Sequence, residues 1–197
     1  MISDFTPVLL FSFSSSLTPG PNNFMLMNAG LHFGVKKSLG HYFGVCIGFP
    51  LMLLILALGF GAVFKHYPII EHILKIVGSA YMLYLAYKIL TSHSKVQNGK
   101  VHKPLSFFQA MLFQWVNPKA WLMGVSAMSI FILNSNPLIN ALILSLIFFL
   151  MCLPCLAVWL VFGKALQNIL KEDHHRRWFN IIMALCLAGS VALIFLE

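Results

Sequence analysis

The chain has 197 residues, of which 59% are hydrophobic and only 9% are charged, and its mean hydropathy is +0.86. A soluble globular domain carries about 25% charged residues, so a water-soluble fold of this composition could not cover its own surface. The formal net charge of +8 would suggest a nucleic-acid partner in a soluble protein. Here the basic residues lie between apolar runs and form no basic face beside stacking aromatics, which argues against nucleic-acid binding.

Long apolar runs follow one another along the chain, each long enough to cross the roughly 30 Å hydrocarbon core of a bilayer as a helix. There are six, at residues 7–29, 40–64, 69–90, 107–133, 138–162 and 178–196. Strands of a membrane barrel would alternate apolar and polar residues, whereas 138–151 is apolar on nearly every side. The sequence therefore predicts an all-α membrane protein, with a single transmembrane domain over 1–197.

Lysine and arginine are spread unevenly over the connections between these runs. Ten of them follow the first, third and fifth runs, against only Lys65 and Lys75 on the opposite side and none at 134–137. Cytoplasmic loops carry the excess of basic residues. The odd-numbered loops are therefore predicted to lie in the cytoplasm, and the N-terminus and the C-terminus outside.

The first run contains the segment Thr18-Pro19-Gly20-Pro21-Asn22-Asn23 at mid-membrane depth. Two prolines around a glycine cannot continue a regular helix. Backbone groups freed within lipid cost several kcal/mol each, so irregular backbone survives only where it is buried in protein or lines a polar cavity. This segment is therefore predicted to interrupt the first span and to face the protein interior.

The fourth run carries a second break, Gln114-Trp115-Val116-Asn117-Pro118-Lys119, in which Pro118 disfavours helical angles at Asn117. The breaks fall in the first span of each set of three, and because three is odd the two sets would have inverted topology. Interrupted helices at matching positions of inverted repeats point to the substrate site of a transporter. We therefore expect two inverted three-helix repeats, 1–92 and 105–197, joined by a cytoplasmic loop at 93–104, with helices 1 and 4 interrupted. The alternative is that the two breaks are helix kinks with a purely structural role.

A new half-helix begins after each break, with Thr18 or Asn22 expected at one N-cap and Asn117 at the other. Helix N-termini carry partial positive charge and free N–H groups, which suit a carboxylate. Lys119 is the only Lys or Arg deep within a run, and an intramembrane charge is functional by default. It would be the counter-charge of a substrate carboxylate or a proton carrier; the alternatives are capping of carbonyls freed by Pro118, or snorkelling.

These arguments predict a substrate-binding site without catalytic residues, metal or cofactor. Its residues are Thr18, Pro19, Gly20, Pro21, Asn22, Asn23, Gln114, Asn117, Pro118 and Lys119.

Three motifs stand in separate spans: Thr18 to Pro21 in the first, Gly78, Tyr81, Met82, Tyr84 and Leu85 in the third, and Asn117 to Lys119 in the fourth. In this combination the chain resembles the lysine-exporter/homoserine-exporter (LysE/RhtB) family of bacterial amino-acid exporters over essentially its whole length. The segments 21–23 and 124–129 are most similar to the branch that exports cysteine and O-acetylserine.

The resemblance implies a secondary transporter, not an enzyme, in the bacterial inner membrane. It would export a small amino acid or derivative, of the cysteine, O-acetylserine, homoserine or threonine type, driven by the proton gradient. Several members of the family carry an acidic residue in the fifth span, whereas 138–162 has none. A carboxylate proton relay is therefore not supported, and Lys119 or the ammonium of the substrate would have to carry the proton.

Two other functions are the alternatives. A divalent-cation exporter needs acidic or histidine ligands inside the spans, but the acids of this chain lie in loops or at span ends: Asp4, Glu71, Glu172, Asp173 and Glu197. A membrane thiol-redox protein would use Cys152 and Cys155, which form a Cys-x-x-Cys pattern. That chemistry needs a lowered thiol pKa and access to a partner, whereas cysteines in apolar surroundings are typically buried packing residues.

Gly40, Gly44 and Gly48 form a small-xxx-small stripe in the second run. Such stripes allow close helix contact, which would serve either folding or a homo-oligomer. The expected partners are thus a small-molecule amino-acid substrate and the lipid bilayer, with a homo-oligomer left open.

Overall fold

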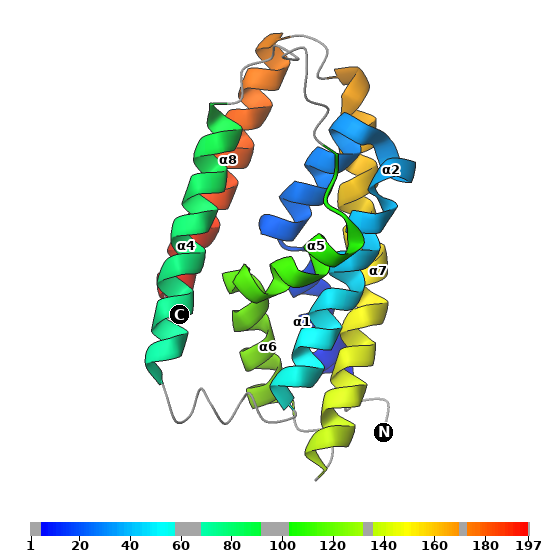
Figure 1. Ribbon diagram of the computed structural model, residues 1–197, viewed down its shortest axis with the longest axis vertical. Helices are drawn as coiled ribbons and strands as arrows, with labels where there is room; N and C mark the ends of the chain where they lie inside the picture. Colours follow the sequence, from blue (N-terminus) through cyan, green and yellow to red (C-terminus); the bar gives the residue numbers. More distant parts are fainter. Residues whose placement is uncertain (1–4, 58–67, 92–102, 132–135, 170–172, 197) are drawn as a thin grey trace.

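A computed structural model describes residues 5–57, 68–91, 103–131, 136–169 and 173–196 (Figure 1). Every regular element in these ranges is a helix, which confirms the predicted all-α fold. In chain order the elements are α1 (Thr6–Leu17), α2 (Pro21–Ile55), α4 (Pro68–Leu90), α5 (Phe107–Phe113), the short 3-10 helix η2 (Gln114–Val116), α6 (Pro118–Ile130), α7 (Pro137–Ile169) and α8 (Asp173–Leu196).

The surface of the described chain is rich in apolar side chains. Leu10 on α1, Phe108 on α5 and Leu185 on α8 are each more than 60% exposed. Among the described residues, two helical stretches have the length and apolar composition needed to cross a membrane: Pro21–Ile55, which includes a reversal of direction at Gly34, and Leu138–Gln167. These features fit an all-α membrane protein, while the count of six spans and their inverted repeats stay predictions.

The long helix α2 turns back on itself at Gly34, where φ is 76° and ψ is 170°. Figure 1 shows its first half rising from the middle of the molecule and its second half descending beside it. This single residue replaces the longer connection expected between the first two runs. Only glycine adopts this positive φ at little cost.

Replacing Gly34 by Ala is expected to lower the stability of the protein by about 1 kcal/mol or more, because Ala disfavours a positive φ. A Cβ at this position would meet nothing closer than Lys164 Cδ at 3.9 Å, so the cost arises in the backbone alone. Thermal unfolding of the detergent-purified protein measures the effect. Gly189→Ala is the control, since a Cβ there would meet no described atom within 4 Å beyond its own stretch of helix. Equal unfolding temperatures for the two variants would contradict the prediction.

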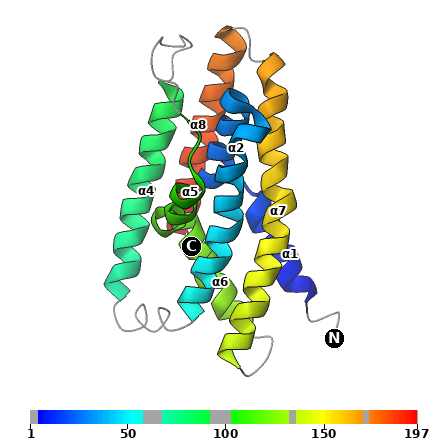
Figure 2. The same ribbon diagram turned by 45° about the vertical axis from the view of Figure 1, so that its right-hand side comes forward.

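The core lies mainly between α2 and α7, with α1 and α5 packed beside them. The largest fully buried side chains in this region include Leu26, Met52, Leu53, Leu144 and Phe148. The pair α4 and α8 stands to one side in Figures 1 and 2 and joins the rest through a second buried cluster. That cluster contains Phe24, Met27, Met82, Leu166 and Leu187.

Glycines let the second half of α2 approach α5 closely. A Cβ at Gly44 would collide with the carbonyl oxygen of Phe107, and one at Gly48 would lie 2.7 Å from Met111 Cα. Gly44 and Gly48 therefore pack α2 against α5 within one chain. Of the two roles considered for the glycine stripe, folding and homo-oligomer formation, this contact supports folding.

Basic residues gather at one end of the molecule. The turn of α2, the C-terminal end of α7 and the N-terminal end of α8 lie together there (Figure 1), and exposed Lys36, Lys37, Lys164 and Arg177 belong to these segments. This grouping agrees with the predicted loop pattern; the side of the membrane that it faces stays a prediction. Of the other basic residues in that pattern, Lys65, Lys95, Lys100 and Lys171 lie outside the described residues, as does most of the loop at 93–104.

Candidate functional site

Both interruptions predicted from the prolines are present, and they lie against each other. α1 ends at Leu17 and α2 begins at Pro21, while η2 ends at Val116 and α6 begins at Pro118. From these breaks the first half of α2 and α6 run in opposite directions (Figure 1). Side chains of each break bond to groups of the other, as the hydrogen bonds of Lys119 and Gln114 show.

The ammonium group of Lys119 reaches from α6 to the end of α1. Its Nζ donates to the carbonyl oxygen of Thr18 at 2.5 Å and to that of Pro19 at 3.3 Å. Unpaired carbonyls and partial negative charge are found at a helix C-terminus, so the ammonium stabilises this end of α1. The carbonyls that it caps are thus those of the first break, not those freed by Pro118.

Gly20 makes room for the stem of this lysine. A Cβ at Gly20 would lie 2.7 Å from Cδ and 3.2 Å from Nζ of Lys119. The absence of a side chain at Gly20 is therefore what lets the charge reach the first break. An ammonium has three N–H donors, and the two carbonyls engage two of them.

A reciprocal amide pair joins the breaks a second time. Asn22 Nδ2 donates to Gln114 Oε1 at 2.8 Å, and Gln114 Nε2 donates back to Asn22 Oδ1 at 3.2 Å. Gln114 is fully buried and also donates to the carbonyl oxygen of Ala110. Asn23 Nδ2 donates to the carbonyl oxygen of Ser16 at 2.9 Å, so amide side chains satisfy much of the irregular backbone.

The N-terminus of α6 is capped as predicted. Asn117 Oδ1 accepts from the N–H of Lys119 at 3.2 Å. The carbonyl oxygen of Asn117 accepts from the N–H groups of Ala120 and Trp121. These donors are therefore engaged, so this helix end offers little to an anion.

The N-terminus of α2 differs from the prediction. Its N-cap is Gly20, in extended conformation and without a side-chain cap, rather than Thr18 or Asn22. Thr18 is instead the C-cap of α1, and its hydroxyl donates to the carbonyl oxygen of Ser14. Phe24 donates to Gly20 at 3.0 Å, but no described group accepts from the N–H of Asn22 or Asn23. Of the two half-helix N-termini at the breaks, that of α2 is thus the one whose N–H groups stay unbonded among the described residues.

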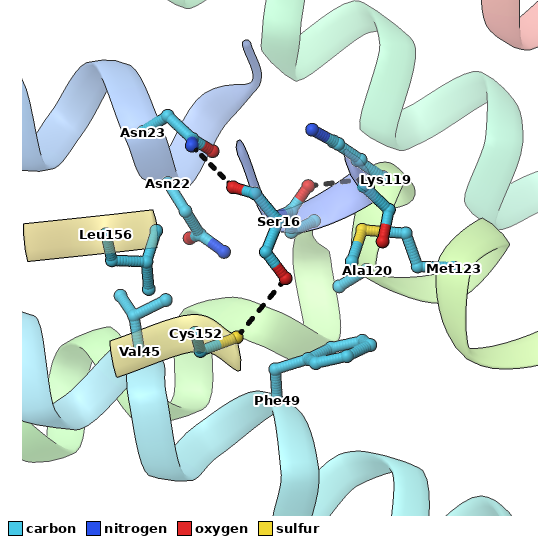
Figure 3. A pocket seen from close by; sticks show the side chains of 12 residues that line it. Ser16, Asn22, Asn23, Val45, Phe49, Lys119, Ala120, Met123, Cys152 and Leu156 are labelled. Carbon is cyan, nitrogen blue, oxygen red and sulfur yellow. Dashed lines mark hydrogen bonds between the residues drawn. The ribbon is translucent and has the colours of Figure 1, made fainter. Parts of the chain in front are cut away.

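A cavity of about 30 Å³ lies beside the two breaks (Figure 3). It is lined by α1, α2, α6 and α7, through Ser15, Ser16, Asn22, Asn23, Val45, Phe49, Asn117, Lys119, Ala120, Met123, Cys152 and Leu156. A space of this size holds about two water molecules, which is less than any amino acid needs. An amino acid could enter only if these helices moved apart.

The predicted site residues divide into two groups around this cavity. Asn22, Asn23, Asn117 and Lys119 line it. The other six support it: Thr18 and Pro19 offer their carbonyls, Gly20 the space for the lysine stem, Gln114 the amide partner, and Pro21 and Pro118 the first residues of the half-helices.

Several lining residues were not predicted. Ser15 and Ser16 belong to α1, and the serine run just before the first break was a signal that could have identified them. Val45 and Phe49 come from the second half of α2, and Cys152 and Leu156 from α7. Val45, Phe49 and Leu156 stand in apolar segments, where no local pattern distinguishes them from core residues. Cys152 belongs to the Cys-x-x-Cys pattern, which pointed to thiol chemistry and not to a cavity wall.

The two cysteines of the Cys-x-x-Cys pattern contact different groups on α1. Cys152 Sγ lies 3.6 Å from Ser16 Oγ at the cavity, whereas Cys155 Sγ donates to the carbonyl oxygen of Phe13 at 3.7 Å. Within the part of the chain that the structure describes, no three His, Cys, Asp or Glu residues are grouped to hold a metal ion.

Comparison with known proteins gives consistent matches over most of the chain. A family model described as LysE type translocator matches residues 13–196. The cysteine/O-acetylserine efflux proteins of Salmonella choleraesuis and Salmonella typhimurium are each 34% identical over 199 residues, covering 96% of this chain and 99% of the relative. The protein of that name from Shigella flexneri is 30% identical over 197 residues with the same coverage. No solved structure matches at a significant level.

Proposed function

Because this chain belongs to the family of LysE type translocators, we propose that it exports a small amino acid or amino-acid derivative from the cytoplasm. The efflux proteins at 30–34% identity carry cysteine and O-acetylserine in their names, so the proposed cargo is of the cysteine, O-acetylserine, homoserine or threonine type. A translocator moves its substrate without converting it, and the chain is accordingly not an enzyme.

The proposed architecture is one domain over 1–197 with six spans in two inverted repeats, 1–92 and 105–197, in the bacterial inner membrane. Support comes from the opposite directions of the half-helices after the two breaks (Figure 1) and from the basic residues gathered at one end. With that end in the cytoplasm, both termini lie outside.

This orientation predicts the behaviour of reporter fusions. Green fluorescent protein joined after Lys37 should fluoresce, because that site is cytoplasmic in the proposed topology, whereas alkaline phosphatase joined there should be inactive. After Asn136 the two reporters should exchange behaviour. The reverse pattern, with active alkaline phosphatase after Lys37 and fluorescence after Asn136, would reject the orientation but would say nothing about which substrate is exported.

The observation that supports the proposed substrate site is that Lys119, bonded to the α1 carbonyls, lines the same cavity as Asn22 and Asn23, whose backbone N–H groups have no described acceptor. An amino acid carries both a carboxylate and an ammonium group, which are complementary to these donors and carbonyls. Its carboxylate would bind the ammonium of Lys119 together with the N–H groups of Asn22 and Asn23. Its own ammonium would then replace Lys119 on the carbonyls of Thr18 and Pro19, so that no charge is left unpaired.

Export is proposed to be driven by the proton gradient. No carboxylate is available in 138–162, so the proton would travel on Lys119 or on the ammonium of the substrate. In proteoliposomes, collapse of an imposed gradient by a protonophore should stop uphill export. If uphill export continues under those conditions, export is not coupled to the proton gradient, although the protein is still a transporter.

The direct test of the function is metabolite profiling of the medium around cells that overexpress the protein. Cysteine, O-acetylserine, homoserine or threonine should accumulate there, and the cells should tolerate inhibitory concentrations of the exported compound. Cells with the empty vector are the control. An unchanged medium for every amino acid measured would contradict the proposal.

A further inference from the structure

Away from the ammonium of Lys119, the wall of the cavity is largely apolar. Phe49 and Cys152 lie on the opposite side from the ammonium of Lys119 in Figure 3. There the hydroxyl of Ser16 and the thiol of Cys152 share one hydrogen bond at 3.6 Å, in which either group can be the donor. The two residues come from α1 and α7, and each is at most 5% exposed.

We propose that the Ser16–Cys152 pair receives the side chain of the exported amino acid and selects short, uncharged side chains ending in a thiol, a hydroxyl or an ester. The inference rests on the proposed function, because it assumes that the backbone charges of the substrate are bound at Lys119 and α2. The side chain would then extend toward the far wall, where this pair is the polar group that it meets.

The chemistry of the pair explains which side chains it favours. A hydroxyl or thiol is both donor and acceptor, so it can donate to one member of the pair and accept from the other. An ester can accept from either. A side chain with a purely aliphatic end has neither a donor nor an acceptor, and each neutral hydrogen bond lost reduces binding about fivefold.

The charge of the cavity acts against basic side chains. Among the described residues that line it there is no Asp or Glu, and the one charged residue is Lys119. A lysine or arginine side chain would therefore be buried without a counter-charge and near a like charge, which is costly. Long side chains are further disfavoured by Phe49, Met123 and Leu156, which close the apolar part of the wall.

The first test compares export of cysteine with export of 2-aminobutyrate, its isostere with a methyl group in place of the thiol. Proteoliposomes loaded with both report a ratio that does not depend on the amount of protein inserted. In Cys152→Val this ratio is expected to fall about fivefold. Cys155→Val is the matched control on the same helix, since Cys155 does not line the cavity, and its ratio should equal that of the wild type.

The second test uses a chain whose only thiol is Cys152, made by Cys46→Ala, Cys155→Ala and Cys186→Ala. Alkylation of Cys152 by N-ethylmaleimide, followed by mass spectrometry, should slow about tenfold with homoserine at ten times its half-saturating concentration. Lysine at the same concentration should leave the rate unchanged. This readout also decides the question if Cys152→Val fails to insert.

The outcomes separate the inference from the proposed function. A wild-type protein that exports cysteine, with an unchanged ratio in Cys152→Val or with no protection of Cys152, would overturn the role of the pair while export stands. A wild-type protein that exports no amino acid would overturn the proposed function itself.

Discussion

Lys119→Ala is expected to abolish export while the protein still inserts and folds. The substitution removes the one ammonium at the cavity, whose bonds to the carbonyls of Thr18 and Pro19 are 2.5 and 3.3 Å long. Hydrogen bonds to a charged group contribute about 1.5–3 kcal/mol each, so the loss of a single such bond to the substrate carboxylate reduces export about tenfold and the loss of two about a hundredfold or more. Insertion should not suffer, because a lysine at mid-membrane depth is itself unfavourable.

Two further variants separate the roles of this side chain. Lys119→Gln keeps an N–H donor for the α1 carbonyls but removes the charge, so it should insert well and remain inactive if the ammonium binds the substrate. Lys164→Ala, at an exposed lysine of α7, is the control and should export normally. Initial rates from proteoliposomes with equal amounts of protein measure all three; full export by Lys119→Ala would remove Lys119 from the mechanism.

Gly163→Ala is expected to be the most damaging single-methyl change for stability. A Cβ at Gly163 would overlap the carbonyl oxygen of Met27 and lie 2.7 Å from its carbonyl carbon. These are backbone atoms of α2, which cannot rotate aside, so the helices must separate. Overpacking of this kind costs about 1–3 kcal/mol and sometimes more, and α2 with α7 forms the centre of the fold.

The loss should appear as a lower yield of monodisperse protein and an unfolding temperature well below that of the wild type. Gly40→Ala is the control, because a Cβ there would lie 3.6 Å from Phe107 N, an ordinary contact distance. Equal unfolding temperatures for Gly163→Ala and Gly40→Ala would contradict the prediction, because they would show that α2 and α7 can move apart without loss of stability.

Features that depend on local backbone chemistry were predictable from the sequence. Pro19 and Pro21 flank Gly20, and Pro118 disfavours helical angles at Asn117, so both breaks followed from the local sequence. Single prolines did not have this effect elsewhere, since Pro50 and Pro154 lie inside α2 and α7. Asn117 was predictable as an N-cap for the same reason, since its side chain bonds to an N–H only two residues away.

Features that depend on contacts between distant segments were not predictable. The carbonyl partners of Lys119 lie about one hundred residues away in the chain, and nothing near Lys119 indicates them. The missing side-chain cap of α2 reflects the space that Gly20 leaves for that lysine, which again depends on the other break. Gly34 was missed because hydropathy locates apolar runs but does not resolve a turn made by one residue.

The small volume of the cavity has a consequence for the idle protein. Room for about two water molecules is too little for a continuous file of solvent from one compartment to the other. In this conformation the cavity itself therefore offers ions and metabolites no continuous path, and passage through it requires a second, wider conformation of the same four helices.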